Sequence, residues 1–195
     1  GEAQAAYMAA RGDVWAASSQ DYDSLLFGAP RLVRNLNITG RRKMPGSKEY
    51  RDIHIEVIEL DKVLEANGLK DREQLIDLCI LMGTDYNQGI RGIGPKKGLK
   101  LIKEHGTIGK ALGSIDASIP DVEVVREIFL RTEHIDEYKL EWRPPERDRI
   151  VEFLCEGHGF SEARVTAALD RVDKRRPARK VEVMPRSQSS LDRWG

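Results

Sequence analysis

The sequence has few cysteines, few aromatic residues, no net charge and no long apolar run, and each lack excludes a class of protein. Two cysteines in 195 residues, Cys79 and Cys155, each lie in an apolar helical pattern. They indicate buried thiols in a reducing cell interior and not a disulfide scaffold. Because 32 Lys and Arg balance 32 Asp and Glu, a uniformly basic nucleic-acid binder is disfavoured. No run approaches the roughly 18 apolar residues of a membrane helix, and no basic-then-apolar leader opens the chain, so we expect no membrane partner.

The remaining composition, 40% hydrophobic, can build a folded α/β core. Short apolar runs predict strands at 14–18, 32–38 and 53–58, with a hairpin-like excursion at 40–51. Helical patterns cover residues 2–11, 59–67, 71–82, 121–131, 146–156 and 161–173. Strands followed by helices predict a parallel sheet, and the start on a helix-forming stretch without an initiator methionine suggests the back part of a longer protein.

Four carboxylates stand at the ends of predicted elements. Asp21 and Asp23 follow a predicted buried strand, Glu2 lies one helix earlier, and Asp85 follows another predicted helix. Acids without histidine or cysteine nearby suit hard cations such as Mg²⁺ or Mn²⁺. Two such ions about 4 Å apart can activate a water and stabilise the leaving oxygen of a phosphodiester. From spacing alone the alternative stays open, in which these acids only cap a helix or form an Asx-turn.

A glycine-rich and lysine-rich segment, residues 89–103, predicts a helix–hairpin–helix. Its glycines permit a tight turn, and Pro95 suits the first position of a helix whose free backbone N–H groups can hold a phosphate. At 100° per residue, Lys96, Lys100 and Lys103 share one face. The segment therefore predicts a clamp for the DNA backbone that reads no bases. The alternative is a solvated lysine face beside an ordinary turn.

Four strings in this order (EAQAA, QDYDSLLFG, DLCILMGTDY and GIRGIGPKKGLKLI) resemble the flap endonucleases, the structure-specific 5′ nucleases of replication and repair. Because the chain between these strings is short and uninterrupted, the sequence is more similar to the archaeal branch of the family than to its long repair nucleases. The resemblance implies an α/β fold, with part of a parallel-sheet, PIN-like 5′ nuclease domain at 1–82. It also implies a helix–two-turn–helix and helical DNA-binding region at 83–173. Residues 174–195, basic and broken by proline, are expected to form a flexible tail.

The resemblance assigns roles residue by residue. Glu2 matches the second glutamate of the family's Glu-x-Glu pair, Asp21 and Asp23 its Asp-x-Asp pair, and Asp85 the acid of its Gly-Ser/Thr-Asp-Tyr motif. These four are the implied catalytic residues and the implied ligands of two Mg²⁺ ions, or Mn²⁺. The other metal-site acids of the family would lie upstream of Gly1, so this chain alone is expected to be inactive or impaired.

Further residues match the family's DNA contacts. The hairpin resembles a loop of the family that holds a monovalent cation, K⁺, against the downstream DNA backbone, with lysines beside the DNA phosphates. A second, weaker match resembles part of the family's pocket for a one-nucleotide 3′ flap. The residues are Gly89, Ile90, Arg91, Gly92, Ile93, Gly94, Lys96, Lys97 and Lys100 for the hairpin and Phe160, Ser161 and Arg164 for the pocket.

The tail resembles the box by which proteins bind the sliding clamp PCNA. Gln188, Leu191 and Trp194 have the i, i+3, i+6 spacing that aligns side chains on one face of a 3₁₀ turn. Gly195 stands where the box has a second aromatic residue, which predicts reduced affinity. The alternative is a polar tail with a few stray apolar residues.

Together these features predict a 5′ flap endonuclease and 5′–3′ exonuclease that acts on branched DNA in replication, including Okazaki fragment processing, and in repair. The expected partners are flapped or nicked double-stranded DNA and PCNA. The expected location is the cytoplasm, with the nucleoid, in an archaeon and the nucleus in a eukaryote. The alternative is a non-catalytic module that binds duplex DNA and the clamp, and the sequence upstream of Gly1 would distinguish the two.

Overall fold

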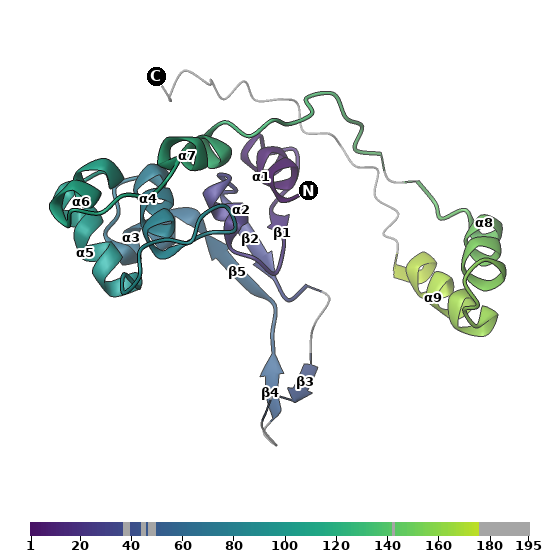
Figure 1. Ribbon diagram of the computed structural model, residues 1–195. Coiled ribbons are helices and arrows are strands. Elements are labelled where there is room, and N and C mark those ends of the chain that lie inside the picture. The colour runs from purple at the N-terminus through teal and green to yellow at the C-terminus, as the bar shows by residue number, and fades with distance from the viewer. Residues whose placement is uncertain (37–39, 44–45, 47–49, 142, 176–195) are drawn as a thin grey trace. The chain divides into compact units, whose positions relative to one another are not determined.

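A computed structural model of the protein describes residues 1–36, 40–43, 46, 50–141 and 143–175 (Figure 1). The chain divides into two compact units, Gly1–Tyr138 and Lys139–Gly195, which are taken one at a time below. Within the described ranges, no helix has the length and apolarity needed to cross a membrane. The predicted clamp-binding residues Gln188, Leu191 and Trp194 lie outside the described residues.

The first unit contains a small mixed sheet. Strands β1 (Ala17–Ser18), β2 (Arg31–Arg34) and β5 (Glu56–Glu59) are adjacent in the order β1-β2-β5. β1 and β2 are parallel, as predicted, but β5 runs antiparallel to β2 with Leu32 opposite Ile58. The chain returns from β2 through a hairpin, β3 (Gly40–Lys43) and β4 (Tyr50–Ile53), instead of a crossover helix, and such a return reverses strand direction. The α/β class and the excursion are confirmed, and the described sheet is mixed because β5 runs antiparallel to β2.

Four helices accompany this sheet. They are α1 (Glu2–Ala10), α2 (Asp23–Leu26), α3 (Leu60–Asn67) and α4 (Arg72–Met82), and the bounds of α1, α3 and α4 agree with prediction to about one residue. Asp71 caps α4 by accepting a hydrogen bond from the Gln74 amide at 2.9 Å, as its capping-box pattern predicts. α4 is buried on several sides and is the central helix of the unit.

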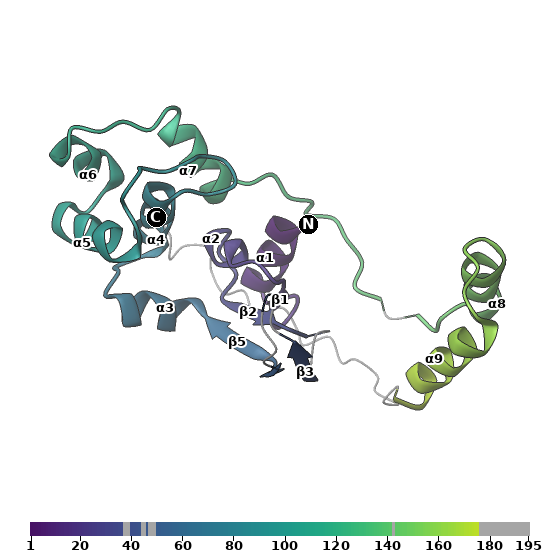
Figure 2. The same ribbon diagram turned by 60° about the horizontal axis from the view of Figure 1, so that its bottom comes forward.

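Helices α5 (Pro95–His105), α6 (Ile108–Ser114) and α7 (Val122–Leu130) pack around α4, and Figure 2 shows α4, α5 and α6 together. Ile76, Ile80, Ile102, Ile108 and Phe129 are almost fully buried in one apolar cluster. Each such side chain contributes about 1.5–3 kcal/mol by leaving water. This cluster contains residues from both sides of position 82. The predicted region boundaries at 82 and 173 stay a prediction.

An ion pair lies inside this helical cluster. Arg126 of α7 donates from Nε to Oδ1 of Asp77 at 2.6 Å, and the Asp77 side chain is 2% exposed. The second Asp77 oxygen accepts from the Ile108 amide at 2.9 Å, at the start of α6. Arg126 also pairs with the exposed carboxylates of Glu73 at 3.1 Å and Glu123 at 3.2 Å. One buried carboxylate therefore joins α4, α6 and α7.

The second unit contains α8 (Arg147–Val151), a π-helical turn at Glu152–Glu156 and α9 (Glu162–Arg175). The predicted single helix at 146–156 is thus an α-helix that widens into a π turn. Arg147 joins α8 to α9 through Asp170 at 2.6 Å and Asp173 at 2.7 Å. Cys155 of the π turn and Cys79 of α4 are free, as predicted, and they are partly buried where the sequence predicted buried thiols.

Candidate active site and nucleic-acid interface

The predicted acids near β1 are connected by a serine. Asp21 and Asp23 follow β1, and Glu2 is the first residue of α1. The Ser19 hydroxyl donates a hydrogen bond to Oε1 of Glu2 and accepts one from the Asp21 amide at 3.1 Å. Ser19 therefore holds the start of α1 against the loop after β1. Sequence reasoning missed it, although a serine just after a buried strand is a usable signal.

Asp23 is the half-buried centre of the four predicted acids. Burial raises its pKa first, and the negative charges of Asp85, Glu2 and Asp21 raise it further. Because these charges act on the Asp23 carboxyl group, the fold brings Asp85, Glu2 and Asp21 into electrostatic range of Asp23. The pKa of the Cys79 thiol is raised to about 11, first by burial and second by the charge of Asp23. Cys79 belongs to α4, so this helix lies close to Asp23.

Among the described contacts these acids form no side-chain cap and no Asx-turn, although Asp23 lies in the first turn of α2, where its charge complements the helix dipole. The residue before α2 is Tyr22, and no side chain caps this helix. In the turn after α4, the side-chain bonds are made by Thr84 and Asn87, whose Oγ1 and Oδ1 atoms are 2.7 Å apart. Thr84 Oγ1 also accepts a hydrogen bond from the Tyr86 amide at 3.2 Å. The side-chain oxygen that accepts from a backbone amide in this turn is thus that of Thr84, whereas the Asx-turn interpretation expected it from Asp85.

The donor set fits a divalent cation in its chemistry. It consists of carboxylate oxygens, the ligands that Mg²⁺ and Mn²⁺ prefer. Burial and, after it, three neighbouring negative charges raise the pKa of Asp23, and a bound cation would oppose both effects. Among the described residues, no three His, Cys, Asp or Glu side chains are already gathered closely enough to hold a metal.

Arg34 of β2 fixes the loop that carries Asp21. Its Nε donates to the Gln20 carbonyl at 3.0 Å, and its Nη1 donates to the Tyr22 hydroxyl. The guanidinium carbon also lies 4.2 Å from the centre of the Tyr22 ring. These contacts fall on both sides of Asp21 in sequence, so Arg34 limits the movement of this loop. The sequence pattern gave no signal for it.

The hairpin after α4 requires glycine. Gly89 has φ +63°, and a Cβ there would lie 2.4 Å from the Gly83 nitrogen and from the Met82 carbonyl carbon. The Ile90 amide donates to the Leu81 carbonyl at 2.9 Å and closes the turn onto the end of α4. The predicted close backbone approach is therefore present.

The charged side of α5 faces solvent. Gly98 would place a Cβ 2.8 Å from Leu78 Cδ1, so α5 packs tightly on α4 through this glycine, and Ile102 is buried. Arg91, Lys96, Lys97 and Lys100 are exposed, and no described carboxylate pairs with them. Lys96, Lys100 and Lys103 line one shallow groove with Leu99 and Glu104, which agrees with the predicted lysine face. The K⁺ site stays a prediction.

The predicted 3′-flap residues lie in the second unit. Phe160 is 58% exposed, and Ser161 and Arg164 are also exposed around the start of α9. The Arg164 amide donates to the Ser161 carbonyl at 3.0 Å. Their role in DNA binding stays a prediction.

Comparison with known proteins shows what this chain is similar to. The family model described as XPG I-region matches residues 1–85, a range that contains all four acids. Flap endonuclease 1 of Archaeoglobus fulgidus is 50% identical over 194 residues, which is 100% of this chain and 55% of that protein. Flap endonuclease 1 of Caldivirga maquilingensis is 54% identical over 178 residues, 89% of this chain and 51% of the relative. The resemblance to the flap endonucleases is confirmed.

The fold agrees with this flap endonuclease resemblance. Flap endonuclease-1 from Methanococcus jannaschii superposes with a TM-score of 0.72 at 39% identity, over 88% of this chain and 50% of that one. The catalytic core of Rad2 in complex with DNA substrate, at 22% identity and a TM-score of 0.65, shares the fold. This chain spans about half the length of the curated flap endonucleases that it matches.

Proposed function

We propose that this chain is part of a metal-dependent 5′ flap endonuclease that acts on branched DNA. The observation that carries the proposal is the placement of Asp85, Glu2 and Asp21 near the half-buried Asp23, whose pKa is raised first by burial and then by these three charges. Burial and the nearby carboxylates make the charged form of Asp23 costly to the fold, and a bound cation would compensate for that cost. The archaeal flap endonuclease relatives support the same activity.

In this proposal Glu2, Asp21, Asp23 and Asp85 hold the divalent ions. Bound Mg²⁺ would supply Lewis-acid chemistry, by activating a water and stabilising the leaving oxygen of a phosphodiester. The chain's own residues set the position of the ligands. Ser19 fixes Glu2 relative to Asp21, and Arg34 fixes the loop on both sides of Asp21.

The hairpin and α5 form the surface proposed for duplex DNA. The tight glycine turn lets a phosphodiester backbone approach closely, and exposed lysines offer positive charge to its phosphates. Neither group presents base-specific geometry, so we expect recognition of DNA shape and charge without recognition of sequence. PCNA binding through residues 188–194 stays a prediction.

The proposal is tested by cleavage assays on a protein of the relatives' full length that carries this sequence. We expect cleavage of a 5′-flap DNA in Mg²⁺, much slower cleavage of a linear duplex, and none after chelation of the metal. Tight binding of the flap without cleavage in Mg²⁺ or Mn²⁺ would contradict the enzyme and favour the non-catalytic DNA-binding module.

A second prediction concerns DNA affinity. Changing Lys96 and Lys97 to alanine should weaken binding equally for all duplex sequences and lower the salt slope by about one to two, because two phosphate contacts are lost. Fluorescence anisotropy over a range of salt concentrations measures this. Lys110→Ala, at an exposed position of α6, is the control and should leave the slope unchanged. A loss of affinity that depends on base sequence would show that the segment reads bases.

A further inference from the structure

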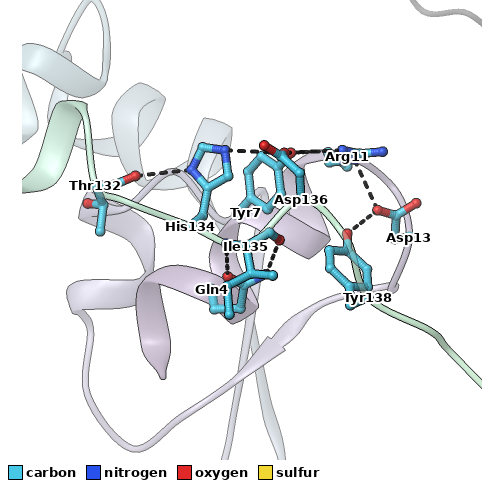
Figure 3. A network of polar contacts seen from close by, with 9 residues as sticks. All are labelled: Gln4, Tyr7, Arg11, Asp13, Thr132, His134, Ile135, Asp136 and Tyr138. Atoms are coloured by element: carbon cyan, nitrogen blue, oxygen red, sulfur yellow. Dashed lines mark hydrogen bonds and ion pairs between the residues drawn. The ribbon is translucent and has the colours of Figure 1, made fainter.

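The segment after α7, residues 132–138, lies along α1, and we call it the strap (Figure 3). Gln4 of α1 donates from Nε2 to the Ile135 carbonyl at 3.0 Å and accepts at Oε1 from the Ile135 amide at 2.8 Å. One side-chain amide thus satisfies both backbone groups of a strap residue. These two residues are 131 positions apart in the sequence.

An aromatic contact continues the attachment one turn further along α1. The Tyr7 and His134 rings stack with centroids 3.7 Å apart and planes 23° apart. The Tyr7 hydroxyl donates to Asp136 and accepts from Nη1 of Arg11 at 2.8 Å. His134 Nε2 lies 3.5 Å from the same Asp136 carboxylate.

The end of α1 holds the end of the strap. Arg11 pairs with Asp13 at 3.1 Å and with Asp136 at 3.7 Å. The Tyr138 hydroxyl donates to the Asp13 carboxylate. Gln4, Tyr7 and Arg11 are spaced i, i+3 and i+7, so one stripe of α1 and its C-cap carries most of the attachment, and Asp13 completes it.

Apart from the strap, α1 is joined to Ser19 and packs on α2 and β1 through small apolar side chains. Its two buried residues are Ala6 and Ala9, and Ala6 belongs to a small apolar cluster with Ala17 and Ala29, joined by Phe27. An alanine buries a single methyl group, so this cluster removes little apolar surface from water compared with the isoleucine-rich core around α4. The strap therefore adds hydrogen bonds, an ion pair and a ring stack to a helix whose own apolar packing is small.

The attached stripe and the predicted ligand lie on opposite sides of the helix. Glu2 and Gln4 differ by about 200° around the axis at 100° per residue. Glu2 is turned to Ser19 and the acids at the end of β1, whereas Gln4 is turned to Ile135. Contacts on one side fix the rotation of a short helix, and that rotation decides where the carboxylate on the other side points.

We propose that Gln4 and Tyr7 are positioning residues, which act through the strap to hold Glu2 at the carboxylate group. The strap would therefore influence the metal affinity of the site, although it contributes no metal ligand. The effect on cleavage rests on the proposed function, whereas the effect on α1 does not.

The test uses Gln4→Ala and Tyr7→Leu in the full-length protein, with Tyr7→Phe as the milder variant that keeps the ring stack. Native-state hydrogen exchange without DNA or metal should show the α1 amides exchanging about tenfold faster in the first two variants, since two hydrogen bonds or the stack are lost. The Mg²⁺ concentration for half-maximal flap cleavage should rise severalfold, with flap affinity unchanged. Tyr7→Phe should fall between the parent and Tyr7→Leu.

Glu133→Gln is the matched control, because Glu133 is an exposed residue of the same strap with no described side-chain partner. It should behave as the parent in both measurements. Unchanged exchange of α1 in Gln4→Ala and Tyr7→Leu overturns the strap as an anchor. Faster exchange with an unchanged Mg²⁺ requirement overturns its role in positioning Glu2. A parent protein that cleaves nothing contradicts the proposed function, and the exchange rates of α1 then still decide whether the strap anchors the helix.

Discussion

In a protein of the relatives' full length, Asp23→Asn should slow flap cleavage by at least about a hundredfold and leave flap binding nearly unchanged. Asn keeps the shape of the side chain but removes its charge, in a site where Asp85, Glu2 and Asp21 surround it. A metal that loses one carboxylate ligand loses several kcal/mol of its stabilisation of the transition state. The lysines of α5 are untouched by the change, so the grip on the duplex remains.

The measurement is single-turnover cleavage of a 5′-flap DNA in Mg²⁺, beside flap binding without Mg²⁺. Asp61→Asn is the matched control, an exposed position in the first turn of α3 that should cleave as the parent does. Cleavage by Asp23→Asn within tenfold of the parent would exclude the metal assignment.

Unfolding gives an independent check on Asp23→Asn. The pKa of Asp23 is raised in the fold, so its charged form is less stable there than in the unfolded chain. This unfavourable contribution is absent below the ordinary Asp pKa and develops as the pH rises through the raised one. The asparagine variant, which resembles the protonated form, should therefore be at least as stable as the parent at pH 7 in the absence of metal.

Local rules explain what the sequence could predict. Asp71 and Gln74 form a capping box, and Pro95 starts a helix. Gly89 marks a tight turn in which a Cβ atom would clash with the backbone. Each of these signals acts over a few residues, so no knowledge of the tertiary fold is needed. The four acids were found by their position at the ends of elements, together with the family resemblance.

Long-range pairing explains what it could not predict. Arg126 and Asp77 are 49 residues apart in the sequence, and Gln4 of α1 and Ile135 of the strap are 131 residues apart. Contacts between such distant residues produce no pattern within a short stretch of sequence. Helix α6 was missed because Gly109 and Gly113 weaken its local propensity, while burial of Ile108 and Leu112 stabilises it. The direction of β5 likewise depends on a hairpin whose return is not encoded in the strand itself.

Arg126→Met is expected to destabilise the Gly1–Tyr138 unit by about 3 kcal/mol at pH 7, at the lower end for breaking a buried ion pair. Methionine keeps much of the apolar stem but cannot donate to the Asp77 carboxylate, whose side chain is 2% exposed. A buried charge is then left with the Ile108 amide as its remaining described donor. Urea unfolding of the full chain, followed by a probe in this unit, measures the loss. Arg131→Met, which breaks an exposed pair with Glu127, should cost less than about 1 kcal/mol.

The pH dependence of this variant identifies Asp77 as the cause. Burial already raises the pKa of Asp77, and the hydrogen bonds from Arg126 and Ile108 oppose that rise. Without Arg126 the pKa climbs further, so the folded variant takes up a proton at a pH where the unfolded chain has none. A folded-state pKa above the unfolded one makes a contribution to stability that is fully present at low pH and is lost as the pH rises. The deficit of Arg126→Met should therefore shrink as the pH falls from 7 toward 4, and adding Asp77→Asn should recover part of it at pH 7 because no buried charge is left unpaired. An equal deficit at both pH values would place the loss in packing around α7 instead of in the Asp77 carboxylate.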